Sequence, residues 1–170
     1  MKMILTLLFF FTFQDIIHAK DFTLSEAQAK YTVKHLFKTV TGESKDLRGK
    51  MVCENQLCEF LVAIPPKSFV SSDSNRDLNM QTILEVTKFP VITVKGKIAE
   101  TELAKQKFEI KALINFHGIE KEYNLKIDRG SQLSGQFSVL LEDHKVERPS
   151  LFMAKIDNEV PLSFTFDWKE

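Results

Sequence analysis

The sequence lacks a charge excess of either sign, because its 23 lysine and arginine residues balance its 23 aspartate and glutamate residues. A protein that binds nucleic acid usually carries a clustered basic surplus, so no nucleic-acid partner is expected. The 170 residues also contain no GxSxG, HExxH or CxxC motif and no glycine-rich phosphate loop. We therefore predict no enzyme activity, no catalytic residues and no cofactor.

Cysteine and histidine are scarce as well, with 2 and 4 residues. Two cysteines need two further ligands to hold zinc, and the histidines lie far apart in the sequence, so no metal site is predicted. Cys53 and Cys58 flank a plausible hairpin turn over 54–57. A disulfide across this hairpin is a reasonable expectation in an exported protein, and two free thiols on adjacent strands are the alternative.

The sequence also has no apolar run long enough for a typical transmembrane helix. After Lys2, the apolar run over 3–13 has about half of the length that a membrane span requires. A short segment then ends in the small residue Ala19, as in secretory signal peptides. We predict a cleaved signal peptide over 1–19 and a single domain over 20–170, in a periplasmic or secreted protein that does not span the membrane. A membrane anchor is the alternative interpretation.

Phenylalanine is abundant, with 15 residues, and much of the chain alternates apolar with polar residues. A period of two is typical of strands with one buried face. Residues 31–40 predict such a strand, with Tyr31, Val33, His35 and Phe37 on one face, followed by a turn at 41–44. Further strands are expected at 47–53, 57–65, 91–97, 107–114, 123–128, 133–141 and 160–168.

The stretch Ser68–Pro90 departs from this pattern. Its first half is rich in serine, aspartate and asparagine, which cap helices and form turns. Leu78, Ile83 and Leu84 fall near helical spacing, and Phe89-Pro90 is expected to end the helical segment. The chain is thus predicted to be all-β with one helical crossover, as a sandwich or as a closed barrel.

Periodicity leaves open whether a barrel of this kind is solid or hollow. An eight-stranded barrel either fills with side chains or holds one small ligand. The small residues Ala112 and Gly135 on the apolar faces would leave room along a tube.

Several polar side chains are candidates for ligand contacts, each with a simpler explanation. His35 lies on an apolar face, where a lone histidine is more often a core or pocket residue than a metal ligand. Arg76, next to Asp77, has the geometry to hold an anionic head group by paired hydrogen bonds, or the two residues form a solvated helix start. Arg148 either serves the mouth of a pocket or ends a strand, and His117 is expected in a solvated turn.

Five segments in order resemble the YceI-like family of secreted or periplasmic lipocalin-like barrels. They are VKHLFKTVTGESKDLRGKM, SFVSSDSNRDLNM, TKFPVITVKGKI, FEIKALINFHGIEKEYNLKI and FSVLLEDHKVERPSL. The resemblance covers nearly all of 20–170. The chain departs from the pattern at Asn79, where members often carry a histidine, in the late loop ERPSLFMAKIDNE, and in its cysteine pair.

The resemblance implies a closed antiparallel lipocalin-like barrel of about eight strands with one short helical crossover. It also implies a tube for one long apolar chain, polyisoprenoid or quinone-like, or for another lipid. A structural or protein-interaction barrel with a solid core is the main alternative, and an enzyme that uses His35 on the same barrel is a third hypothesis. A homodimer is compatible with each of them. The predicted ligand-binding residues are Tyr31, Val33, His35, Phe37, Arg76, Phe108, Ile110, Ala112, Phe137, Val139, Leu162, Phe164 and Phe166.

Overall fold

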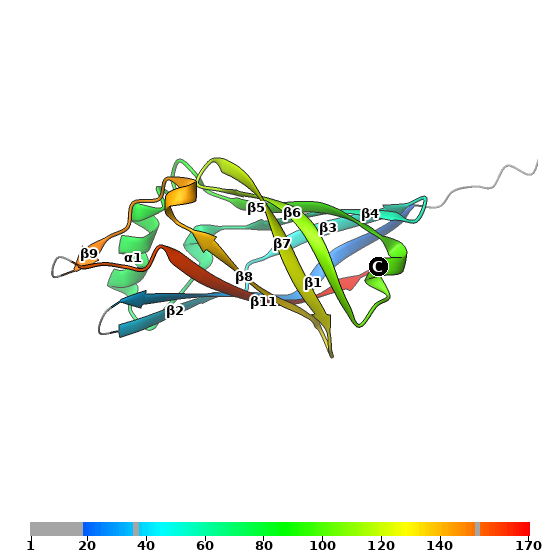
Figure 1. Cartoon of the computed structure of the whole chain (residues 1–170), viewed down its shortest axis with the longest axis horizontal. Helices are drawn as coiled ribbons and strands as arrows, with labels where there is room; N and C mark the ends of the chain where they lie inside the picture. Colours follow the sequence, from blue (N-terminus) through cyan, green and yellow to red (C-terminus); the bar gives the residue numbers. More distant parts are fainter. Residues whose placement is uncertain (1–18, 36–37, 152–153) are drawn as a thin grey trace, which may run out of the picture.

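A computed structural model of the chain describes residues 19–35, 38–151 and 154–170. In this part of the chain, eight antiparallel strands close into a barrel (Figure 1). In order around the barrel they are β1 (Lys20–His35), β3 (Arg48–Glu54), β4 (Leu57–Ile64), β5 (Ile92–Ala99), β6 (Lys107–Phe116), β7 (Ile119–Arg129), β8 (Leu133–Leu140) and β11 (Glu159–Lys169). Pairing of β11 with β1 joins the two edges of the sheet. The predicted fold class is confirmed.

Three short strands stand outside this ring. β2 (Lys38–Ser44) pairs with the second half of β1 and extends the barrel at one end. β9 (Ser150–Leu151) and β10 (Ala154–Lys155) form a separate two-stranded sheet near the same end (Figure 1).

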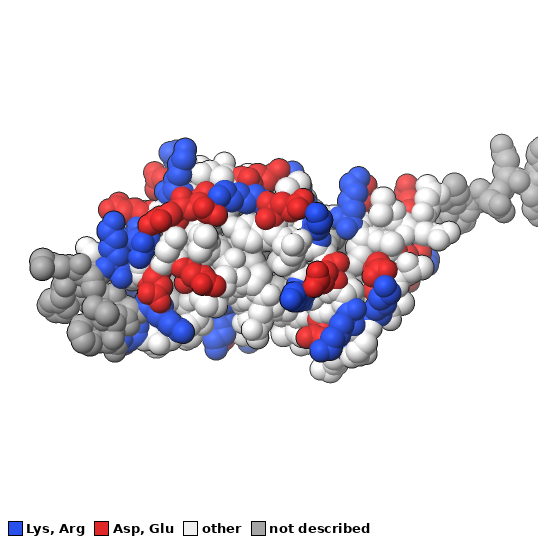
Figure 2. Space-filling view, in the orientation of Figure 1, with Lys and Arg blue, Asp and Glu red and all other residues white. Residues whose placement is uncertain are grey.

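Strand β6 shows how the sequence builds the wall of the barrel. Its buried residues, from Phe108 to Phe116, alternate with exposed residues such as Lys107 and Lys111. Because successive side chains of a strand point to opposite faces, the apolar set lies inside and the charged set outside. Acidic and basic side chains are interspersed on the visible outer face (Figure 2). Their ion pairs, such as Lys111 with Glu122 at 3.4 Å, are exposed and contribute little to stability.

Strand β1 carries a bulge that changes which residues face inward. Its pairing with β11 shifts by one residue between Ser25 and Gln28, and Glu26 has a left-handed φ of 48°. An extra residue moves a strand's inward set by one position. Leu24 therefore faces inward before the bulge, and Tyr31 faces inward after it.

The predicted strand over 31–40 and turn over 41–44 were wrong. The strand begins at Lys20, the chain reverses between His35 and Lys38, and 41–44 belongs to β2. The alternation over 31–40 runs across a hairpin, and both strands of a hairpin have the same period of two. Alternation alone therefore did not reveal the reversal.

The crossover between β4 and β5 contains a 3-10 turn (Pro66–Ser68), a backbone bridge from Val70 to Glu43 of β2, and helix α1 (Ser74–Ile83). Asp73 caps α1, because its carboxylate accepts hydrogen bonds from the backbone N–H groups of Asn75 and Arg76.

The predicted helical segment is confirmed, but its stop and its buried face differ from expectation. The helix ends at Ile83, before Phe89-Pro90, and Glu85 follows with a left-handed φ of 45°. Leu78 is 59% exposed and faces away from the barrel. Ile83 and Leu84 pack against the core.

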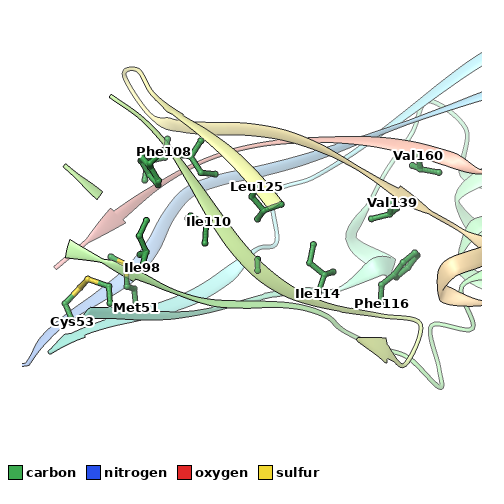
Figure 3. Packing of buried hydrophobic residues seen from close by; sticks show 14 of the residues in the cluster. Met51, Cys53, Ile98, Phe108, Ile110, Ile114, Phe116, Leu125, Val139 and Val160 are labelled. Atoms are coloured by element: carbon green, nitrogen blue, oxygen red, sulfur yellow. A yellow bond between two sulfur atoms is a disulfide. The ribbon is translucent and has the colours of Figure 1, made fainter. Parts of the chain in front are cut away.

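The opposite end of the barrel contains the hairpin between β3 and β4 and helix α2 (Glu100–Leu103). Asn55 and Gln56 have φ of 50° and 65°, as a two-residue type I′ turn requires. This turn sets Cys53 opposite Cys58, and a disulfide joins them. The bond lies beside Met51 and Ile98 in the buried cluster (Figure 3).

Among the described residues, none of the helices combines the length and apolar character needed to cross a membrane.

Candidate functional site

A cavity of about 620 Å³ occupies the interior of the barrel. Its wall is formed by inward-facing residues of the barrel strands and β2, and by α1, α2 and the segment after β8. Most lining side chains are aliphatic or aromatic. The barrel is therefore hollow and apolar inside.

Most of the predicted ligand-binding residues surround this cavity. They are Tyr31, Val33, Arg76, Phe108, Ile110, Phe137, Val139, Leu162, Phe164 and Phe166. Ala112 is fully buried but does not line the cavity. Phe37 and the side chain of His35 lie outside the described residues.

Other lining residues were not predicted from the sequence. They include Phe60, Phe69, Met80, Ile83, Leu84, Phe116 and Trp168. Phe60 lies in the nearly continuous apolar run CEFLVAI, where no period of two marks the inner face. Trp168 continues the alternation of β11, which was the available signal for it.

Three inward-facing aromatic rings each lie over a glycine of the neighbouring strand. The pairs are Tyr31 with Gly42, Phe60 with Gly96, and Phe164 with Gly135. A Cβ atom added at these glycines would come within 2.4, 2.8 and 2.4 Å of the respective rings. The rings thus occupy space that a side chain would take at the wall. This arrangement holds three large residues beside the wall and leaves the middle of the barrel open.

The expectation that Gly135 leaves room along the tube therefore needs correction. The space over Gly135 is filled, because an added Cβ atom would come within 2.4 Å of the Phe164 ring and 2.7 Å of the Lys126 carbonyl oxygen. The glycines make room for aromatic rings rather than for a ligand.

The charged and amide side chains that line the cavity lie at one end. Arg76 and Asn79 come from α1, Lys38 from the start of β2, and Glu147 from the segment between β8 and β9. Figure 1 shows α1, β2 and β9 at the same end of the barrel. We call this end the polar end.

Arg76 is held within this end by its neighbours. Its guanidinium lies 3.5 Å from the Asp73 carboxylate, and its side chain is 26% exposed. Asp77 does not pair with Arg76 in the hydrogen bonds of the structure; both of its carboxylate oxygens accept from the Ser71 N–H, at 3.0 and 3.1 Å. Burial, reinforced by the Asp77 charge, raises the pKa of the Tyr31 hydroxyl, while the Arg76 charge opposes that rise.

Arg148 holds the backbone at the polar end. Its guanidinium donates to the carbonyl oxygen of Ile156 at 2.7 and 2.9 Å and pairs with Glu142 at 2.8 Å. These contacts tie the segment before β9 to the segment after β10. Glu147, its neighbour in sequence, lines the cavity.

The model of the YceI-like domain matches residues 21–168. The chain belongs to the YceI-like family. No curated sequence gives a significant match.

Solved structures with the same fold are found at low sequence identity. A polyisoprenoid binding domain from Saccharophagus degradans, implicated in plant cell wall breakdown, has a TM-score of 0.69 at 15% identity over 87% of this chain and 97% of that one. BcnA of Burkholderia cenocepacia has a TM-score of 0.69 at 12% identity over 85% and 97%. The YceI protein of Campylobacter jejuni has a TM-score of 0.61 at 16% identity over 81% and 90%.

This YceI-like barrel has a buried histidine behind the polar end that the sequence did not single out. His144 is fully buried, and its Nδ1–H faces the carbonyl oxygens of Phe116 at 3.0 Å and Ile119 at 3.1 Å. Its Nε2 accepts a hydrogen bond from the Tyr123 hydroxyl at 2.7 Å. Burial lowers the pKa of His144, and the two carbonyl contacts oppose this only in part.

His117 was predicted to be solvated in its turn, which was wrong. Its side chain is 9% exposed and lies 4.4 Å from the Phe89 ring, centroid to centroid. One ring nitrogen contacts the His144 carbonyl oxygen and the other the Glu85 carboxylate, both at 3.0 Å. The two histidines together fasten the β6–β7 turn to the crossover and to the segment after β8.

The pairing of glycine with an aromatic ring predicts an unusual result for Gly42→Ala in the YceI-like barrel. Alanine normally stabilises a strand interior relative to glycine by about 0.5–1 kcal/mol. Here the new methyl would meet the Tyr31 ring, so the variant should lose about 1–3 kcal/mol of unfolding free energy in urea titrations.

A double-mutant cycle isolates this clash. Gly42→Ala should become neutral or stabilising in a Tyr31→Ala background. Gly130→Ala serves as the control, because its nearest neighbouring atom is 3.7 Å away. Equal destabilisation by Gly42→Ala in both backgrounds would show that the ring contact is unimportant.

The buried His144 predicts a pH-dependent stability. Its folded pKa is lowered, whereas the unfolded chain takes up a proton below about pH 6.5. The stability that His144 contributes is thus complete above that pH and decreases as the pH falls toward the folded pKa. In urea titrations, His144→Gln should cost about 1–3 kcal/mol at pH 7.5, and the difference should shrink at pH 5. Tyr123→Phe removes the hydrogen bond to Nε2 but keeps the buried imidazole, so it should retain a loss of stability toward low pH, because burial is the main cause of the lowered pKa of His144. A difference that stays constant with pH would contradict this account of His144.

Proposed function

We propose that the protein binds a lipid with one long apolar chain inside the barrel, and that it does so without catalysis. The observation that carries this proposal is the hollow apolar cavity with its charged and amide side chains gathered at one end. An amphiphile has the same distribution of polarity. An interaction module with a solid core would leave no such volume.

The distribution of polar side chains in the cavity supports one orientation of the lipid. Its apolar chain would extend along the barrel toward α2, and its head group would stay at the polar end with Arg76, Asn79 and Lys38. Each buried methylene contributes about 0.8 kcal/mol. A long chain thus provides enough free energy to offset the loss of ligand freedom without specific polar contacts.

A similar structure supports this class of ligand. The Saccharophagus degradans domain is described as polyisoprenoid binding, and we propose a polyisoprenoid, a quinone-like molecule or another single-chain lipid for this protein. Asn79, where YceI-like proteins often carry a histidine, lines the polar end. This difference suggests a head group unlike that of such relatives.

The proposed location is the periplasm or the cell exterior. The N-terminal sequence has the character of a signal peptide, although residues 1–18 lie outside the described part of the chain. The disulfide between Cys53 and Cys58 is compatible with an oxidising compartment.

The proposal predicts that the purified protein carries or takes up lipid. Native mass spectrometry should detect a bound lipid, and lipid-free protein should bind a fluorescent fatty acid such as cis-parinaric acid. Val94 lines the cavity, and its neighbour Lys95 is exposed on the outer face. Val94→Trp should block uptake by filling the lumen, whereas Lys95→Trp should leave it unchanged. Folded protein that neither carries nor takes up any lipid would disprove the proposal.

Arg76 provides a separate test of head-group binding. If its guanidinium binds an anionic head group, Arg76→Gln should weaken binding of a fatty acid about tenfold or more. This is the change in affinity expected when one hydrogen bond to a charged group is lost. Binding of the matching fatty alcohol should change little. Arg48→Gln is the control, because the Arg48 side chain is 83% exposed. If both ligands bind unchanged and only stability falls, Arg76 serves the helix start with Asp73.

A further inference from the structure

The size of the cavity limits the length of chain that it can enclose. At about 30 Å³ per carbon, close to the share of one water molecule in the liquid, a cavity of about 620 Å³ corresponds to roughly 20 carbons. The volume of about 30 Å³ per carbon applies to a chain that fills the lumen as closely as side chains fill a protein core.

The length of the barrel gives a similar figure. Phe108 and Phe116 line opposite ends of the cavity on the same strand, β6. Eight residues span about 27 Å along a strand, or roughly 20 Å along the axis at a tilt of about 40°. An extended hydrocarbon advances about 1.3 Å per carbon by covalent geometry, so roughly 16 carbons fit in line.

The end of the cavity opposite the polar end is closed by apolar side chains. Met51, Ile98 and Phe108 line it and are only 4%, 5% and 6% exposed. Figure 3 shows these three side chains gathered at one end of the cluster beside the disulfide, with Phe116 at the other end. Leu103 of α2 also lines this part of the cavity.

Three contacts hold helix α2 across this closed end of the cavity. The Glu100 N–H donates to the Gln56 carbonyl oxygen of the disulfide hairpin at 2.8 Å. The Glu100 carboxylate pairs with Lys20 at the start of β1, at 2.8 Å. The Arg129 guanidinium, from the end of β7, donates to the Leu103 carbonyl oxygen. These contacts hold α2 and Leu103 in place as the floor of the cavity.

We propose that this floor makes the protein selective for chain length, with Phe108 and Leu103 setting the limit at about 16–20 carbons. This inference rests on the proposed lipid-binding function. A chain of that length would be enclosed completely. The additional carbons of a longer chain would stay outside the polar end, where they gain no burial.

Binding of saturated fatty alcohols from 12 to about 28 carbons, with one constant head group, tests the limit. We expect displacement of cis-parinaric acid to strengthen by about fourfold per added methylene, the factor for burial of one methylene. The gain should stop at about 16–20 carbons. Phe108→Ala should move this limit to longer chains by about four carbons, since the removed ring leaves a cavity.

Phe116→Ala is the matched control. Phe116 lies on the same strand, lines the same cavity and is 8% exposed, but at the polar end, so its truncation should leave the limit unchanged. Leu103→Ala, at a half-buried position, gives the same test with a smaller risk to folding and should also lengthen the limit.

The outcomes separate this inference from the function on which it rests. Affinity that keeps rising to 28 carbons, or equal shifts in Phe108→Ala and Phe116→Ala, would overturn the length limit while leaving lipid binding intact. Absence of binding at every length would overturn both. A limit that moves with Phe108 and Leu103 but not with Phe116 supports the floor as the determinant.

Discussion

The hollow interior depends on packing between aromatic rings and glycines on adjacent strands. A barrel of eight strands is narrow enough for side chains to fill, and the chain contains 15 phenylalanines. Tyr31, Phe60 and Phe164 nevertheless leave the lumen open, because each ring takes the space where the paired glycine lacks a side chain. Covering glycine with a cross-strand aromatic ring also protects an otherwise weak position of the sheet. The same contact therefore supports the wall and preserves the cavity.

The two ends of the barrel differ in polarity and in how they are closed. At one end, buried apolar side chains close the cavity. The disulfide hairpin lies beside them, and the Arg129 contact holds α2 in place over them. At the polar end, α1 and the segment after β8 contribute charged and amide groups. Strand β1 contributes Leu24 and Tyr31 to the cavity wall. Both side chains face the lumen because the bulge between them shifts the inward-facing positions by one residue. An amphiphile has only one orientation that suits both ends.

The sequence predicted the features that depend on local pattern. The alternation of β6 identified Phe108 and Ile110 as inward-facing, and the Ser-Asp-Asn segment located the helical crossover. Features that depend on strand register were not predicted. Gly42 was assigned to a turn, although it pairs with Tyr31 inside a strand, and the bonding of Cys53 to Cys58 stayed open until their register was known. His144 was missed because its partners, Phe116, Ile119 and Tyr123, are brought to it by tertiary structure.

The most direct test of the account is an NMR measurement of contacts inside the lumen of the lipid-loaded protein. Nuclear Overhauser effects should connect the chain of a ¹³C-labelled fatty acid to the rings of Phe60 and Phe164, and its terminal methyl group to Phe108 at the closed end. The lipid-free protein should show no contacts between the Phe60 and Phe164 rings across the open lumen. Ring-to-ring contacts across the barrel, with no ligand contacts to any of these residues, would contradict the claim that the barrel encloses a lipid chain.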